Sequence, residues 1–95
     1  MAKRELIFRA HALRRMFERE ISRESVRRAV VAGRVIQSYP EDVPYPSRLM
    51  LWFEGKRPIH VVAADIPNTQ RTVIITVYEP DPQKWSEDYI TRKQP

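Results

Sequence analysis

The sequence predicts a single α+β domain in which two N-terminal helices pack on a four-stranded, mostly antiparallel sheet. Two observations support this fold class. Apolar residues recur at helical spacing over residues 8–32, and apolar, β-branched runs separated by short turns occupy residues 35–79. Residues 80–95 form a tail. The 95 residues allow one domain, and the 42% hydrophobic and 31% charged content is close to the globular average.

Two helices are expected before residue 33. The first spans Phe8–Glu20, because its apolar residues fall within an arc of roughly 160° at 100° per residue. The second spans Arg23–Ala32, where Ser22 is placed to cap the N-terminus and Gly33 follows at a common helix end. Since only two residues separate the helices, they should pack together or share one sheet face.

Four strands are expected after the helices, at Val35–Tyr39, Arg48–Phe53, Ile59–Asp65 and Thr72–Glu79. Three prolines make residues 39–46 a loop, because proline lacks an amide donor and restricts the residue before it. The nearly continuous apolar run of the third strand is typical of a central strand, and the β-branched residues of the fourth favour a strand strongly. The sheet face away from the helices is available for a shallow site.

Several classes of protein are disfavoured by what the sequence lacks. Without cysteine there is no disulfide, no thiol nucleophile and no cysteine-ligated metal. There is no run of about 18 apolar residues and no long apolar signal-peptide core, so a cytoplasmic location without membrane contact is expected. The two histidines are far apart, and there is no glycine-rich phosphate loop and no G-x-S-x-G elbow. We therefore expect no cofactor and no metal site.

Positive charge is concentrated in the N-terminal third of the chain. The net charge is +5, but residues 1–34 hold ten bases and four acids, whereas residues 35–95 hold seven bases and eight acids. Thirteen of the seventeen bases are arginine, whose planar donors suit phosphate and carboxylate. We expect residues 1–34 to form the principal contact with a polyanion or an acidic protein. An ordinary solvated basic face is the alternative.

Three potential cations share one face of the first helix. His11, Arg15 and Arg19 stand at positions i, i+4 and i+8, where like charges repel and an anionic partner would relieve the repulsion. A solvated face partly neutralised by neighbouring glutamates is the alternative.

A second histidine stands in an apolar strand. Alternation can place His60 on the same sheet face as Thr76 and Tyr78, which predicts a partly solvent-accessible ring. A core histidine that donates to a backbone carbonyl explains the position as well.

These residue types suffice for RNA cleavage without a metal. A base must remove the proton of the ribose 2′-hydroxyl, and an acid must protonate the leaving 5′-oxygen. Histidine can fill either role near neutral pH. Arginine supplies fixed donors for the phosphate oxygens.

A series of short motifs runs in order along residues 8–85. It comprises His11-Ala12, Arg15-Met16, Arg19, Ile21-Ser22, Gly33, Tyr39-Pro40, Asp42, Ser47-Arg48-Leu49, Arg57-Pro58-Ile59-His60-Val61-Val62, Ile75-Thr76-Val77-Tyr78-Glu79-Pro80-Asp81-Pro82 and Trp85. This series resembles the bacterial domain-of-unknown-function family 4258. The basic turn at residues 54–57 departs from the family pattern.

The resemblance implies a fold and a function. Members of the family are often encoded beside a small antitoxin-like protein with a zinc-finger segment, and the family is similar to RelE-type toxins grouped with barnase-like ribonucleases. A RelE-toxin-like fold is therefore implied, with the helices followed by an antiparallel sheet. A toxin of a type II toxin-antitoxin system is the implied function, with RNA and an antitoxin as partners.

Two functional hypotheses follow. The first is a metal-independent endoribonuclease toxin. Its catalytic residues would be His11 and His60 as base and acid in either order, Thr76 and Tyr78 as orienting hydroxyls, and Arg15 as a phosphate ligand. Arg19, Arg48 and Arg57 would bind the substrate. The second is a catalytically silent module that binds nucleic acid or protein, with Tyr39, Tyr45 and Trp52 as stacking surfaces. In either case Trp85 should pack back on the domain and anchor the tail.

Overall fold

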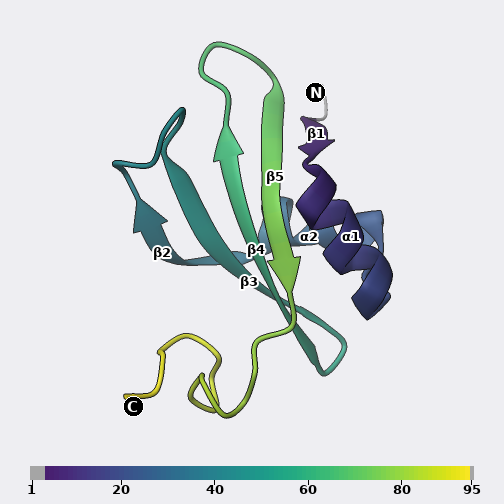
Figure 1. Ribbon diagram of the computed structural model, residues 1–95, viewed down its shortest axis with the longest axis vertical. Helices are drawn as coiled ribbons and strands as arrows, with labels where there is room; N and C mark the ends of the chain where they lie inside the picture. Colours follow the sequence, from purple (N-terminus) through teal and green to yellow (C-terminus); the bar gives the residue numbers. More distant parts are fainter. Residues whose placement is uncertain (1–3, 95) are drawn as a thin grey trace.

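The computed structural model describes residues 4–94, which form an α+β fold of two helices and one five-stranded mixed sheet (Figure 1). The elements in chain order are β1 (Glu5–Phe8), α1 (Ala10–Arg19), α2 (Arg23–Ala32), β2 (Arg34–Tyr39), β3 (Ser47–Glu54), β4 (Arg57–Asp65) and β5 (Arg71–Tyr78). Residues 1–3 of the basic N-terminal third and residue 95 of the tail lie outside the described part. Neither helix in residues 4–94 is long and apolar enough to cross a membrane.

The expected four-stranded, mostly antiparallel sheet after two N-terminal helices is wrong. A strand, β1, precedes both helices and pairs in parallel with β5, which gives the strand order β1-β5-β4-β3-β2. Because a strand comes before the helices, the expected RelE-like order of helices followed by an antiparallel sheet is also wrong. Four residues are too few to show alternation, and only pairing with a distant part of the chain makes Glu5–Phe8 a strand.

Both helices pack on one face of the sheet and bury the core there. The buried core residues are Ala12, Met16, Ile21, Val26, Ala29, Ile59, Val61, Ala63, Ile74 and Val77. The Oγ of Ser22 accepts the N–H of Ser25 at 3.0 Å and so caps α2. Gly33 ends α2, where a Cβ would lie 2.3 Å from the carbonyl oxygen of Ala29. Glycine is therefore required at this close approach.

β1 borders only the first half of β5. Its register pairs Glu5 with Arg71 and Phe8 with Ile74, and the chain leaves the sheet at Arg9, whose N–H donates to the Ile74 carbonyl at 3.1 Å. Helix α1 then runs beside the remainder of β5 (Figure 1). The second half of β5 is consequently flanked by a helix face rather than by a strand.

The sheet face opposite the helices is covered by the tail near the end of β5. Trp85 is 5% exposed, and its ring lies 4.5 Å from that of His60 at an interplanar angle of 89°. His60 is fully buried, its Nε2 lies 2.8 Å from the Tyr89 carbonyl oxygen, and its Nδ1 lies 3.2 Å from the Tyr78 hydroxyl. The expected packing of Trp85 is thus confirmed.

The expected accessibility of His60 is wrong, because the tail covers the face on which His60 lies. The alternative of a core histidine that donates to a backbone carbonyl is confirmed. One tautomer satisfies both contacts: Nε2–H donates to the Tyr89 carbonyl, and Nδ1 accepts from Tyr78. His60 joins β4, β5 and the tail, and has no free ring nitrogen for a substrate.

Replacing Trp85 by alanine should destabilise the fold, because it opens a cavity over His60. Loss of a buried tryptophan typically costs about 3 to 5 kcal/mol in the free energy of unfolding. Urea denaturation of Trp85→Ala measures this loss, with Gln83→Ala, an exposed neighbour, as the control. Equal stability of the two variants would show that the tail is not anchored by Trp85.

The buried His60 should make stability depend on pH. Burial lowers the pKa of His60 below its ordinary 6.5, and the hydrogen bond to the Tyr89 carbonyl opposes this shift. His60 of the unfolded chain therefore becomes protonated near pH 6.5, whereas His60 of the folded chain stays neutral until its lower pKa is reached. The free energy of unfolding consequently falls as the pH drops from 6.5 to the folded-state pKa. Melting temperatures between pH 7 and 5 should fall more steeply in the wild type than in His60→Gln. Parallel curves would contradict this.

Candidate functional site

A pocket of about 310 Å³ lies where α1, the end of β5 and the tail meet. We call it the basic pocket, and it is lined by Arg15, Arg19, Tyr78, Glu79, Asp81, Lys84, Trp85 and Arg92. Helix periodicity places Arg15 and Arg19 on one face of α1, and the anchored tail brings Lys84 and Arg92 to the same pocket. Segments more than sixty residues apart in the sequence thus contribute cations to one site.

The four cations of the basic pocket outnumber its two carboxylates, Glu79 and Asp81. Within residues 4–94, none of its four cations forms an ion pair. Of the two lining acids, Glu79 is held by Arg57 at 3.0 Å, and this hydrogen bond lowers the pKa of the Glu79 carboxyl. Clefts with a surplus of one charge concentrate ligands of the opposite sign. The basic pocket therefore favours an anion.

Aromatic groups form part of the wall. The Arg92 guanidinium carbon lies 5.4 Å from the centre of the Trp85 ring, a cation–π contact that holds Arg92 beside the pocket. Burial raises the pKa of the Tyr78 phenol, the neighbouring Tyr39 acts in the same direction, and Arg92 opposes them. Tyr78 therefore keeps its proton at neutral pH, and its hydroxyl donates to Nδ1 of His60.

An exposed histidine adjoins the basic pocket along α1. His11 precedes Arg15 by one helical turn, and its Nε2 lies 3.0 Å from Oγ1 of Thr76, two residues before Tyr78. When Nε2–H donates to Thr76, Nδ1 carries a lone pair, and it has no hydrogen-bond partner among the described residues. The His11–Thr76 pair can thus exchange a proton with a bound molecule.

The structure places the five expected catalytic residues in three different surroundings. His11 and Thr76 form the exposed pair, Arg15 and Tyr78 line the basic pocket, and His60 lies beneath the tail. Because β4 pairs His60 with Tyr78, the two share a face, but the tail separates His60 from solvent.

Of the three expected substrate ligands, only Arg19 lines the basic pocket. Arg57 donates to the carbonyls of Arg19 and Glu20 at the end of α1, and also binds Glu79. Arg48 pairs with Asp65 at 3.4 Å. Both side chains are held by protein groups.

Sequence reasoning missed two cations of the tail. Lys84 and Arg92 lie beyond the last expected strand. The feature of the sequence that could have indicated them is the basic chain end around Trp85. Once Trp85 is taken as an anchor, its basic neighbours must lie close to the domain.

Histidine, aspartate and glutamate side chains do not gather in groups of three or more that could hold a metal ion, as far as residues 4–94 are concerned.

Most of the chain matches a protein-family model. The family model described as "Domain of unknown function (DUF4258)" matches residues 8–79, which are 72 of the 95 residues. No curated protein and no solved structure matches the chain. The match includes α1, α2 and β2–β5 and ends before Lys84 and Arg92. Because it covers well over half of the sequence, the chain belongs to the DUF4258 family.

Proposed function

We propose that the protein is a metal-independent endoribonuclease that acts in the cytoplasm as the toxin of a type II toxin-antitoxin system. One observation carries the proposal: a pocket lined by four cations and two carboxylates, in which none of the cations forms an ion pair within residues 4–94, adjoins the exposed His11–Thr76 pair. An RNA phosphodiester offers the negative charge for the pocket and a 2′-hydroxyl proton for the histidine.

The proposed reaction begins at His11. Its Nδ1 takes the proton of the 2′-hydroxyl while the 2′-oxygen forms a bond to phosphorus. The bond between phosphorus and the 5′-oxygen then breaks, which leaves a 2′,3′-cyclic phosphate on one product. The 5′-oxygen takes a proton from water, since the site is open to solvent, and leaves as a hydroxyl. In this step Oγ1 of Thr76 accepts from Nε2–H of His11, which leaves Nδ1 to take the proton.

The cations of the basic pocket stabilise the charge that develops on the phosphate. Arg15 and Arg19 approach from α1, and Lys84 and Arg92 approach from the tail. Guanidinium groups can bind two phosphate oxygens at once, and donors fixed before the reaction need no reorganisation during it. His60 acts through the tail: by binding the Tyr89 carbonyl it keeps the tail cations in position.

The antitoxin is the proposed protein partner, and α1 offers it a surface. Phe17 is 86% exposed, and Leu13, one turn earlier, is 38% exposed. Arg14 and Glu18 lie on the same exposed helix. A large exposed apolar ring on a basic helix suits an acidic amphipathic segment, such as one in an antitoxin that also carries a zinc finger.

A binding module without activity is the second candidate. It is favoured by the fact that only one of the two histidines is exposed, so one of the two proton-transfer roles lacks a histidine. If the protein has this function, the basic pocket and α1 bind nucleic acid or an acidic protein, and no bond is cleaved.

Substitution of His11 should abolish RNA cleavage without destabilising the fold. Loss of a proton-transfer group typically lowers a rate about 10² to 10⁴-fold, and His11 is exposed. Cleavage of a labelled RNA in EDTA by the wild type, His11→Asn and Thr76→Val measures this, with melting curves as the folding control. Growth after induction is the cellular readout. RNA binding without cleavage by the wild type would favour the binding module instead.

RNA affinity should decrease with salt and with loss of the basic pocket's cations. Each phosphate contact releases counterions, so the logarithm of the binding constant falls with that of the salt concentration, by about 0.7 per contact for single strands. Arg15→Gln and Arg19→Gln should each weaken binding and reduce this slope. Arg14→Gln, on the same helix but outside the pocket, is the matched control. A flat salt dependence, or equal losses in all three variants, would contradict the assignment.

A further inference from the structure

The outer edge of β1 is an edge of the sheet that no strand covers within residues 4–94. β1 comes first in the strand order and pairs only with β5. The N–H groups of Glu5 and Arg9 both donate toward β5, to the carbonyl oxygens of residues 70 and 74 at 2.7 and 3.1 Å. Because the backbone groups of successive strand residues point to opposite sides, the N–H and C=O groups of Leu6 and Phe8 point outward. These two residues can therefore pair with a further strand.

The two edges of the sheet differ in how well they are protected against such pairing. At the opposite edge, the register of β2 is interrupted by an irregularity between Val35 and Gln37. Bulges of this kind hinder the addition of a strand from another chain. β1 keeps an unbroken register with β5, and its four residues include neither proline nor lysine. The edge at β1 is therefore the one that is open to a strand.

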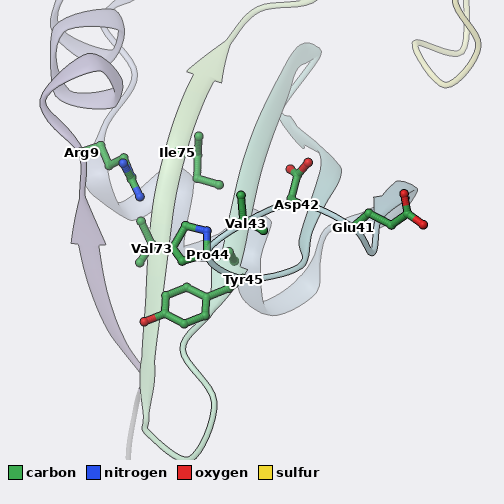
Figure 2. Close-up of a pocket in the computed structure, with 9 residues that line it drawn as sticks. Arg9, Glu41, Asp42, Val43, Pro44, Tyr45, Val73 and Ile75 are labelled. Atoms are coloured by element: carbon green, nitrogen blue, oxygen red, sulfur yellow. The ribbon is translucent and has the colours of Figure 1, made fainter.

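The side chains of this segment alternate between the two faces of the sheet. Arg9 lies beside Val73 and Ile75 on the face under the proline-rich loop, where all three line a pocket of about 370 Å³ (Figure 2). Leu6 and Phe8 pack against the core on the other face, which the helices cover. The outward backbone groups of Leu6 and Phe8 are thus accompanied by apolar side chains on the face that carries α2.

A pocket of about 400 Å³ lies between β1 and α2. We call it the edge pocket, and it is lined by Glu5, Leu6, Phe8, Arg23, Glu24 and Arg27. Nη1 of Arg27 donates to the carbonyl of Arg4 at 2.9 Å, just before β1 begins. The guanidinium carbon of Arg23 lies 5.2 Å from the centre of the Phe8 ring, where β1 ends. The two cations therefore flank the open edge at its two ends, with the half-buried Leu6 between them.

The free charge of the edge pocket is positive. Its two acids, Glu5 and Glu24, each lie in an ion pair with an arginine outside the pocket, at 3.5 and 2.7 Å. Arg23 and Arg27 form no ion pair within residues 4–94. A surplus of one charge attracts groups of the opposite sign. The edge pocket therefore favours a ligand that is apolar at its centre and anionic at both ends.

We propose that the edge pocket binds an extended acidic segment of a partner protein, which adds a strand to the sheet beside β1. Leu6 and Phe8 supply the backbone hydrogen bonds, and an apolar side chain of the segment packs on Leu6. Alternate side chains of a strand lie on one face, so carboxylates two residues before and after that side chain face Arg23 and Arg27.

A protein strand fits the edge pocket better than a nucleic acid does. The open edge offers N–H and C=O groups in alternation, and another peptide backbone presents the matching groups at the same spacing. A polynucleotide has no such row of donors and acceptors. The edge pocket shares no lining residue with the basic pocket, so binding there does not depend on the proposed RNA cleavage.

The test uses the full chain and a capped synthetic peptide, Thr-Glu-Thr-Val-Thr-Glu-Thr, whose sequence reads the same in both directions and so suits either strand direction. Hydrogen exchange of the amides is followed by NMR. Exchange at Leu6 and Phe8 should become at least about 10-fold slower in the complex, because their N–H groups gain hydrogen bonds. The amide of Ile7, which points toward β5, should keep its rate.

Control peptides separate the backbone contacts from the charge contacts. A peptide with Gln in place of both Glu residues keeps the backbone and should bind about 10-fold more weakly, because it loses two charge-assisted contacts. A peptide with proline at its three central positions keeps both charges but cannot pair as a strand, and it should not slow exchange at Leu6 or Phe8.

Variants of the protein test the two cations. Arg23→Gln and Arg27→Gln should each weaken binding of the acidic peptide several-fold, and Arg14→Gln, an exposed arginine of α1 outside the edge pocket, is the matched control. Melting curves show whether each variant is folded, which matters for Arg27 because it also binds the Arg4 carbonyl.

Equal affinity for the Glu and Gln peptides, or binding without slower exchange at Leu6 and Phe8, would overturn the proposal. Exchange at these amides that slows with rising protein concentration and no peptide would assign the edge to a second copy of the chain instead. Slower exchange of the same amides with single-stranded RNA, but not with the peptide, would refute a protein partner.

Discussion

The candidate site formed by the basic pocket and the His11–Thr76 pair depends on the short parallel pairing between β1 and β5. Because β1 ends at Phe8, opposite Ile74, the chain turns into α1 while half of β5 still lacks a neighbour on that edge. Helix α1 takes this place and sets its polar face along Thr76 and Tyr78. A longer β1 would pair with these residues and displace the helix. The position of the His11–Thr76 pair beside the basic pocket is thus a consequence of where one edge strand stops.

The second constraint is the buried hydrogen-bonded histidine beneath the tail. Both ring nitrogens of His60 have partners, so the desolvation of the imidazole is offset by two hydrogen bonds and by packing against Trp85. Removal of either hydrogen-bond partner would leave a ring nitrogen of His60 buried without a hydrogen bond. This cost favours the observed packing of the tail over other positions of the tail. The tail is thereby fixed as a wall of the basic pocket, and residues beyond the family match complete the site.

Local signals in the sequence were sufficient for part of this account. Helical periodicity, the Ser22 cap and the glycine at position 33 placed both helices, and β-branched runs placed the four antiparallel strands, each to within a few residues. The row of His11, Arg15 and Arg19 was visible for the same reason. β1 and the ion pairs that hold Arg48 and Arg57 were not predictable, because each depends on a contact with a distant part of the chain. For the same reason the sequence left the burial of His60 as one of two alternatives.

The most direct test of the central claim is the crystal structure of the protein with a dinucleotide whose 2′-hydroxyl is replaced by hydrogen, so that it cannot be cleaved. We expect the phosphate within hydrogen-bond distance of Arg15 and Arg92, with the 2′-carbon facing Nδ1 of His11. A dinucleotide bound elsewhere on the surface, or a phosphate in the basic pocket with its ribose turned away from His11, would contradict it.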